Sequence, residues 1–156
     1  AGVNDLKLRL VLPPPEYARR GGEIIAQQLK AIGIAVEIVP VEWAQWLSDV
    51  FKAKNYDLTI ISHVEPMDLD IYARDDYYFD YHSDAYKAVM TELAATTDET
   101  KRIELIGKAQ KILADDSVNV FLFLLPKSGI WNAKLKGLWE NAPIPVNDLT
   151  EVEWTE

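Results

Sequence analysis

Apolar and polar positions along the first 62 residues predict strands and helices in alternation. Residues 6–12 alternate apolar and charged side chains and then become apolar throughout, which is typical of a strand, and Pro13 to Pro15 end it. Apolar residues at helical spacing predict a helix at 16–32, with Gly33 as its C-cap glycine. The elements expected next are a strand at 34–39, a helix at 43–54 and a strand at 57–62 that is buried on both faces. This order and spacing implies right-handed crossovers and a parallel sheet.

The second half of the chain departs from this alternation. Residues 63–84 are polar and aromatic without a clear period, and two helices are expected after them, at 84–96 and 98–115. Thr96 with Glu99, or else Thr97 and Asp98, are expected to cap the second of these helices. The remaining expected elements are an apolar strand at 118–125, a short strand paired with it at 128–132, and an extended tail at 133–156. We therefore expect one α/β lobe over residues 1–132, with a mixed, mainly parallel sheet flanked by helices, and a C-terminal tail.

The chain is acidic and contains no cysteine. It has 25 Asp and Glu against 16 Lys and Arg, a net charge of −9, and 49% hydrophobic residues in 156 positions. This composition is that of a globular domain, and the acidity disfavours nucleic acid or an anionic membrane as the main partner. Without cysteine, the sequence excludes disulfides, zinc–thiolate sites, iron–sulfur clusters and cysteine nucleophiles. It also lacks an apolar run of about 18 residues and so predicts no membrane-spanning helix.

The segment from Asp57 to Asp84 carries most of the candidate chemistry. Its many carboxylates stand against the single Arg74 and are interleaved with tyrosines and two histidines. It begins at the C-terminal end of a predicted parallel strand, where ligands bind in open α/β sheets. Carboxylates beside aromatic faces suit a cationic or amphipathic ligand. The alternative is an acidic, solvated loop whose tyrosines anchor it to the domain.

Metal-binding and catalytic motifs are weak in this sequence. Asp68–Asp70 begins like a calcium loop, but Tyr72 and Ala73 stand where that loop needs an oxygen ligand and a glycine. The two histidines lack a third ligand at a typical spacing. Nucleophile-elbow, phosphate-binding and dinucleotide-binding motifs are absent. We predict no metal, no cofactor and no catalytic residue, and acid–base catalysis by loop carboxylates such as Glu65 stays the enzyme alternative.

Short patches occur in a characteristic order along the chain: Ile25–Glu37, Glu42–Leu47, Tyr56–Ile61, Asp98 with Arg102, Ala109–Asp115 and Val118–Leu125. In this order they resemble the C-terminal lobe of periplasmic solute-binding proteins of the peptide, dipeptide and nickel class (extracellular solute-binding protein family 5), which feed ABC importers. The resemblance implies a lobe of the periplasmic-binding-protein type II kind, within a two-lobed protein that closes on its ligand by a hinge motion. It implies that the N-terminal lobe is missing. The start at Ala1, without Met or a signal-peptide pattern, agrees with a fragment.

The resemblance also indicates a ligand wall, with one departure from the family pattern. After the buried strand, peptide binders of this family carry a Trp and then a loop with Asp-Pro, whose aspartate can hold the amino terminus of the peptide. Here His63 stands at the Trp position, and Glu65-Pro66 replaces Asp-Pro unless the aspartate is shifted to Asp68. Acidic groups would hold a cationic end, and Tyr72 or a nearby tyrosine would stack on the ligand. The implied ligand-binding residues are His63, Glu65, Asp68, Asp70 and Tyr72; a different solute class, or hydrogen bonds within the loop, are the alternatives.

These observations predict solute capture for an ABC importer and no catalysis. The expected solutes are peptides or related small cationic or amphipathic molecules, bound by one half of an inter-lobe cleft in an extracytoplasmic, periplasmic protein. The expected partners are the solute, the missing N-terminal lobe and the ABC permease subunits, with no nucleic acid. In isolation the chain is expected to bind solute weakly or not at all, and its tail, with Trp139 and Trp154, to pack on a second copy. A ligand-sensing domain of a regulator with the same lobe fold is the remaining alternative.

Overall fold

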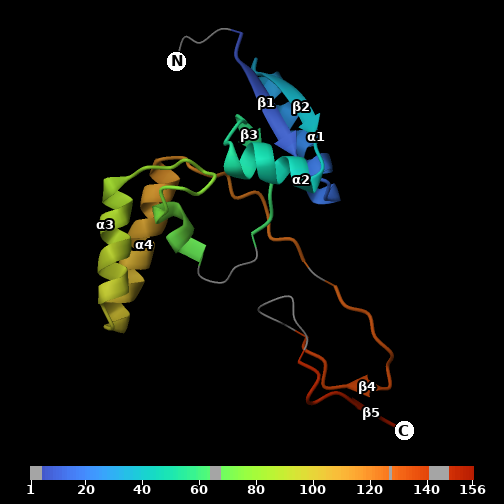
Figure 1. Cartoon of the computed structure of the whole chain (residues 1–156). Coiled ribbons are helices and arrows are strands. Elements are labelled where there is room, and N and C mark those ends of the chain that lie inside the picture. The colour runs from blue at the N-terminus through green and yellow to red at the C-terminus, as the bar shows by residue number, and fades with distance from the viewer. Residues whose placement is uncertain (1–4, 64–67, 127, 141–147) are drawn as a thin grey trace. The chain divides into compact units, whose positions relative to one another are not determined.

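The chain divides into two compact units, which are described separately. A computed structural model describes residues 5–63, 68–126, 128–140 and 148–156. The first unit consists of Ala1–Ile61 with Leu69–Asn119, and the second of Ser62–Asp68 with Val120–Glu156 (Figure 1). The first unit holds a three-stranded sheet and a pair of long helices, and the second holds one short pair of strands. The predicted lobe boundary at residue 132 stays a prediction.

The sheet of the first unit is parallel, as the sequence predicts. Its strands lie in the order β2 (Ala35–Pro40), β1 (Lys7–Leu12), β3 (Leu58–Thr59), with Val11 opposite Val39 on one side and Thr59 on the other. The third strand is shorter than the predicted 57–62. The ladder between β1 and β3 ends at Val11 and Thr59, one residue before β1 ends at Leu12 and the prolines begin.

Helix α1 (Glu16–Ala31) packs on β1 and β2 and ends as the sequence predicts. Gly33 has a φ of +87°, a left-handed conformation that glycine adopts without steric cost. Its amide donates to the carbonyl of Lys30, and the amide of Ile34 donates to the carbonyl of Leu29. These bonds satisfy carbonyls at the helix end and turn the chain directly into β2.

Two neighbouring glycines in α1 differ in how closely the sheet approaches them, and this gives a matched test of the packing. A methyl group on Gly22 would lie 2.4 Å from Cδ1 of Leu12, a side chain that is only 1% exposed. A methyl group on Gly21 would meet nothing nearer than Cδ1 of Ile60 at 3.7 Å.

Gly22→Ala is therefore expected to destabilise the protein by about 1–3 kcal/mol through overpacking. Gly21→Ala is expected to stabilise it by about 0.5–1 kcal/mol through helix propensity. Urea unfolding followed by circular dichroism measures both, and an equal effect of the two substitutions would contradict the packing.

The predicted helix at 43–54 forms, but it is not a regular α-helix. A short α-helical turn, α2 (Trp43–Gln45), continues as a π-helix, η1 (Trp46–Lys52). Apolar spacing predicts one packed face of Trp43, Trp46, Leu47, Val50 and Phe51. Trp46 and Val50 are buried, whereas Trp43 and Leu47 are exposed, so only part of this face is covered. The indole N–H of Trp46 donates to Oγ1 of Thr59 at 3.0 Å, and that hydroxyl donates to the carbonyl of Val11 at 2.7 Å. This chain of hydrogen bonds links the helix to β3 and β1.

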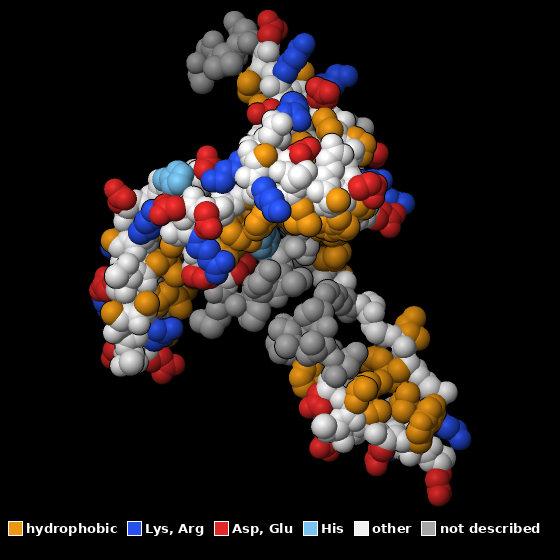
Figure 2. Space-filling model, in the orientation of Figure 1, with side chains coloured by type: hydrophobic (Ala, Val, Ile, Leu, Met, Phe, Trp, Pro, Cys, Tyr) orange, Lys and Arg blue, Asp and Glu red, His pale blue; other side chains and the backbone are white. Residues whose placement is uncertain are grey.

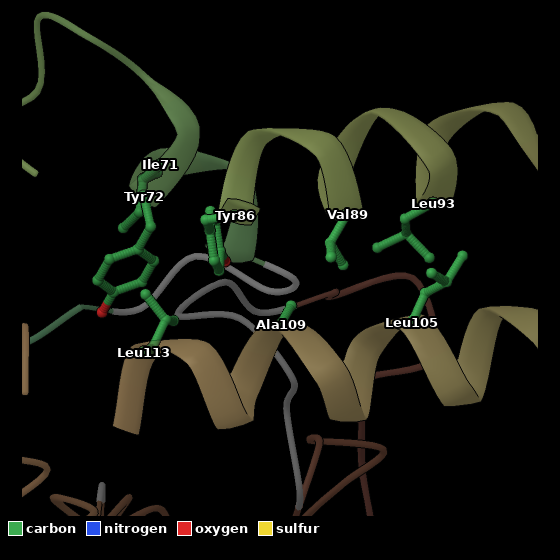
Figure 3. Close-up of a cluster of buried hydrophobic side chains, with 8 residues drawn as sticks. All are labelled: Ile71, Tyr72, Tyr86, Val89, Leu93, Leu105, Ala109 and Leu113. Carbon is green, nitrogen blue, oxygen red and sulfur yellow. The ribbon is translucent and has the colours of Figure 1, made fainter. Parts of the chain in front are cut away.

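Helices α3 (Asp84–Ala95) and α4 (Glu99–Asp115) pack against each other and confirm the two helices predicted there. Oγ of Ser83 caps the first, and Asp98 caps the second by accepting from the amide of Lys101 at 2.7 Å. Their buried residues recur every three or four positions and face one another (Figure 3). In α4, apolar spacing predicts an inward stripe of Ile103, Ile106, Ala109, Ile112 and Leu113; this is partly wrong, because Ile103 is exposed and Leu105 is buried in its place.

The strands predicted at 118–125 and 128–132 are not found in the described part of the chain. A strand needs a neighbour for its backbone groups, and the sheet of the first unit ends at β2 and β3. The second unit instead contains β4 (Leu135–Lys136) and β5 (Glu153–Trp154), which pair antiparallel. Leu135 lies opposite Trp154 in that pair.

Candidate functional site

Three of the predicted site residues lie on one short helix. The 3₁₀-helix η2 (Asp68–Ala73) follows the third strand in sequence and carries Asp68, Asp70 and Tyr72. Positions three apart lie on the same face of such a helix, so Asp68, Asp70 and Tyr72 lie on three different faces of it. Ile71 and Tyr72 are buried in the core formed with α3 and α4, whereas Asp70 is exposed and Asp68 is half-buried. Apolar residues thus hold the helix while a carboxylate remains at its surface.

The carboxylate of Asp70 is paired within its own loop. It accepts a hydrogen bond of 2.6 Å from the guanidinium of Arg74, four residues later. The same hydrogen bond, followed by the charge of Asp70, raises the pKa of Arg74. Arg74 also lies over the ring of Tyr77, at 5.9 Å from its centroid. Both partners of the ion pair are largely exposed, and such pairs contribute little to stability.

Tyr72 is a core residue of the first unit. It is 7% exposed, and its ring stacks on Phe79 with centroids 4.8 Å apart and an interplanar angle of 19°. Its hydroxyl accepts a hydrogen bond of 2.5 Å from the side-chain amide of Asn119. These contacts fix the position of η2, and direct contact of Tyr72 with a solute stays a prediction.

The other predicted site residues are placed differently. His63 is half-buried, and with Asp68 it belongs to the second compact unit, whereas Asp70 and Tyr72 belong to the first. Glu65 lies outside the described residues. Asp68, Asp70 and Tyr72 therefore share the helix η2, and the gathering of all five residues into one site stays a prediction.

A network of charges anchors the other end of the loop. Lys54 donates to Asp80 at 2.6 Å, Lys87 pairs with Asp75, and the two ring nitrogens of His82 lie 3.4 Å from these two carboxylates. The hydrogen bond from Lys87 holds the pKa of Asp75 below its usual value, and that from Lys54 does the same for Asp80. Sequence reasoning missed this network because both lysines lie outside the loop.

Aromatic packing completes the anchoring. The hydroxyl of Tyr56 donates to the carbonyl of Tyr78 at 2.8 Å. Burial, and secondarily the charge of Asp80, raises the pKa of Tyr56 to about 12. Tyr78 is buried and packs edge-on against Trp46, with centroids 5.5 Å apart. Several of the loop tyrosines therefore fasten it to the domain, as the solvated-loop alternative expects, while Asp68 and Asp70 are not part of this anchoring network.

The described residues also bear on metal binding and on membrane insertion. They contain no group of three or more His, Asp or Glu side chains arranged to hold a metal ion. None of the helices in the described ranges combines the length and apolar character needed to cross a bilayer. Two shallow hollows lie beside β2, lined by residues of β1, β2 and α1. None of the predicted site residues lines these hollows.

Comparison with solved structures identifies the fold. The oligopeptide-binding protein AppA of Bacillus subtilis, in complex with a nonapeptide, superposes with a TM-score of 0.75 at 17% identity, over 97% of this chain and 32% of that chain. A dipeptide-binding protein of Pseudoalteromonas sp. SM9913, in complex with Met-Leu, superposes with a TM-score of 0.70 at 14% identity, over 97% of this chain and 33% of that chain. The periplasmic binding protein DppA of Helicobacter pylori, in complex with the peptide STSA, superposes with a TM-score of 0.64 at 21% identity. This match covers 74% of this chain and 25% of that chain.

The chain spans about a third of the length of the two solved chains that match it over 97% of its residues. No family model matches the sequence, and no curated protein matches it either. The likeness therefore shows the fold: the chain is a mixed α/β lobe with a small parallel sheet flanked by helices, matching one lobe of periplasmic binding proteins. These neighbours are an oligopeptide-binding, a dipeptide-binding and a periplasmic binding protein, each in complex with a peptide.

Proposed function

We propose that the chain is the C-terminal lobe of a family 5 solute-binding protein and captures solute for an ABC importer. One observation carries this proposal: a lobe with the fold of peptide-bound receptors carries, after a parallel strand, a short helix η2 with one exposed carboxylate, Asp70, and one half-buried carboxylate, Asp68. Ligands of open α/β sheets bind beyond the carboxyl ends of the strands. The proposed solutes are peptides or related small cationic or amphipathic molecules.

The proposed binding wall is the segment from His63 to Tyr72. Asp68 and Asp70, with Glu65, supply negative charge for the cationic end of a solute, and His63 adds a hydrogen-bonding group. Asp70 exchanges its exposed pairing with Arg74 for the solute cation, which requires little free energy because both partners are already in water. Tyr72 and Ile71 keep the wall in place from the core side.

The second half of the proposed cleft comes from a lobe outside these 156 residues. Its closure excludes water and so strengthens the charge interactions between solute and carboxylates. The closed form presents a composite surface to the permease subunits. This role places the protein in the periplasm, or outside the cytoplasmic membrane more generally.

A thermal-shift screen of the full-length parent protein tests the proposal. The screen measures the melting temperature in the presence of di- and oligopeptides, oligosaccharides or metal chelates. The same measurements are made on the variants Glu65→Gln, Asp68→Asn and Asp70→Asn. A peptide at about 100 times its Kd is expected to stabilise the folded protein by about 2.7 kcal/mol. At least one amide variant is expected to lose this stabilisation.

Asp76→Asn is the matched control, because Asp76 is an exposed carboxylate of the same loop outside the proposed set. It should respond to the peptide as the unchanged protein does. Stabilisation by another solute class, equal in all three amide variants, would overturn the proposed binding wall.

A further inference from the structure

Two residues in an unusual backbone conformation are joined by an ion pair. Lys54, directly after η1, has a φ of +54°, and Asp80, in the loop 74–83 between η2 and α3, has a φ of +51°. Nζ of Lys54 donates to Oδ1 of Asp80 at 2.6 Å. The left-handed region suits glycine and is tolerated by aspartate, but the side chain of lysine makes it unfavourable. Residues in such conformations persist where the surrounding structure holds them, and they cluster at functional positions.

The end of η1 does not itself require a lysine. The amide of Lys54 donates to the carbonyl of Val50, so the backbone closes the helix through a bond that any residue other than proline could make. Glycine is the usual residue at the left-handed position after a helix, and Gly33 holds that position after α1. Lysine adds what glycine lacks, a charged side chain that reaches Asp80 and is only 28% exposed.

The loop 74–83 connects two buried clusters of the first unit. Tyr77 and Phe79 pack against the cluster that contains residues of β1 and η1, and also against the cluster formed with α3 and α4. Phe79 stacks on Tyr72 of η2, with ring centroids 4.8 Å apart. Asp80 directly follows Phe79, so the ion pair at Asp80 restrains the backbone beside the ring on which η2 rests.

Charges bond this loop to two different parts of the first unit. Lys54 stands at the end of η1, which contacts β1, whereas Lys87, the partner of Asp75, belongs to α3. Basic and acidic side chains lie next to one another over this part of the surface (Figure 2). The loop is thus bonded to the helical pair through Asp75 and to the sheet layer through Asp80.

We propose that Lys54 is a positioning residue for the solute-binding wall. Its ion pair with Asp80 sets the place of Phe79 against the sheet layer, and the stacking of Phe79 on Tyr72 carries that position to η2 and the carboxylate of Asp70. Binding groups are held precisely when the residues behind them are themselves fixed by packing and hydrogen bonds. This inference rests on the proposed function, in which Asp70 meets the solute.

Two substitutions of Lys54 separate its charge from its backbone conformation. Lys54→Gln removes the charge, and Lys54→Gly removes both the charge and the unfavourable conformation, so the glycine variant should require more urea to unfold. We expect both variants to speed amide hydrogen exchange of residues 68–73 by about 2- to 5-fold, the range set by an exposed ion pair, with no change in β1. Lys54→Arg keeps the charge and should restore slow exchange.

Lys111→Gln is the matched control for the loss of a paired lysine. Lys111 pairs with Asp115 at 2.9 Å on the exposed side of α4, and its substitution should leave the exchange of η2 unchanged. Unchanged exchange of η2 in both Lys54→Gln and Lys54→Gly would overturn the inference. Equal acceleration in β1 and η2 would also overturn it, because Lys54 would then stabilise the fold in general.

Solute affinity in the intact protein gives a readout that a merely structural role would not move. Lys54→Gln and Lys54→Gly are both expected to bind a peptide about 2- to 5-fold more weakly than the unchanged protein, although the two variants differ in stability. Equal affinity of all three proteins would overturn the positioning role. Absence of any peptide binding by the unchanged protein would contradict the proposed function alone, and the exchange measurement, which needs no solute, would still decide this inference.

Discussion

Tyr86→Ala is expected to destabilise the protein by about 3–5 kcal/mol and to release η2 from the helical pair. Tyr86 is fully buried at the start of α3 and contacts the rings of Tyr72 and Tyr81. Its hydroxyl donates to the carbonyl of Leu69, inside the acidic helix, at 2.8 Å. The substitution therefore leaves a cavity in the core and removes the tie that holds the candidate site (Figure 3).

Tyr86→Phe separates these two effects. It keeps the ring and removes only the hydrogen bond, which is expected to cost about 1 kcal/mol. Urea unfolding measures the free energy of both variants, and amide hydrogen exchange measures the opening of residues 68–73. A loss below about 1 kcal/mol for Tyr86→Ala would contradict the packing described. Faster exchange confined to η2 in Tyr86→Phe is the expected sign that the hydroxyl positions the site.

Apolar spacing and capping residues predicted the helices and strands that depend mainly on their local sequence. The first strand, the helix that ends at Gly33 and the helical pair all follow from apolar spacing and from residues that cap or terminate them. Parallel pairing followed from the strand–helix–strand order. The choice among Thr96, Thr97 and Asp98 as cap needed the structure, because all three side chains carry suitable oxygens.

Features that depend on distant partners were beyond sequence reasoning. The run at 118–125 has the composition of a strand, but a strand also needs a neighbour, and the described chain gives it none. The charge network around His82 joins the loop to Lys54 and Lys87 from other elements. Tyr72 or a nearby tyrosine was predicted to stack on the ligand; its packing on Phe79 places the ring of Tyr72 in the core, and its contact with a solute stays a prediction.

The second large expected effect is a loss of affinity when the lobe stands alone. If half of the cleft supplies about half of the binding free energy, a peptide that binds the intact protein with a Kd of about 1 μM keeps about −4.1 kcal/mol. That value corresponds to a Kd of about 1 mM for the 156-residue chain, a loss of roughly a thousandfold. The exposed position of Asp70 agrees with this expectation, because a charge pair in water is weak until a second surface covers it.

Isothermal titration of one peptide against the intact protein and against the 156-residue chain is the most direct test of the half-cleft account. We predict that the intact protein binds the peptide tightly and that the 156-residue chain binds it with a millimolar Kd or undetectably. Circular dichroism should show that both samples are folded. Equal affinity of the two, or nanomolar affinity of the short chain, would contradict it, because the binding site would then lie entirely within residues 1–156.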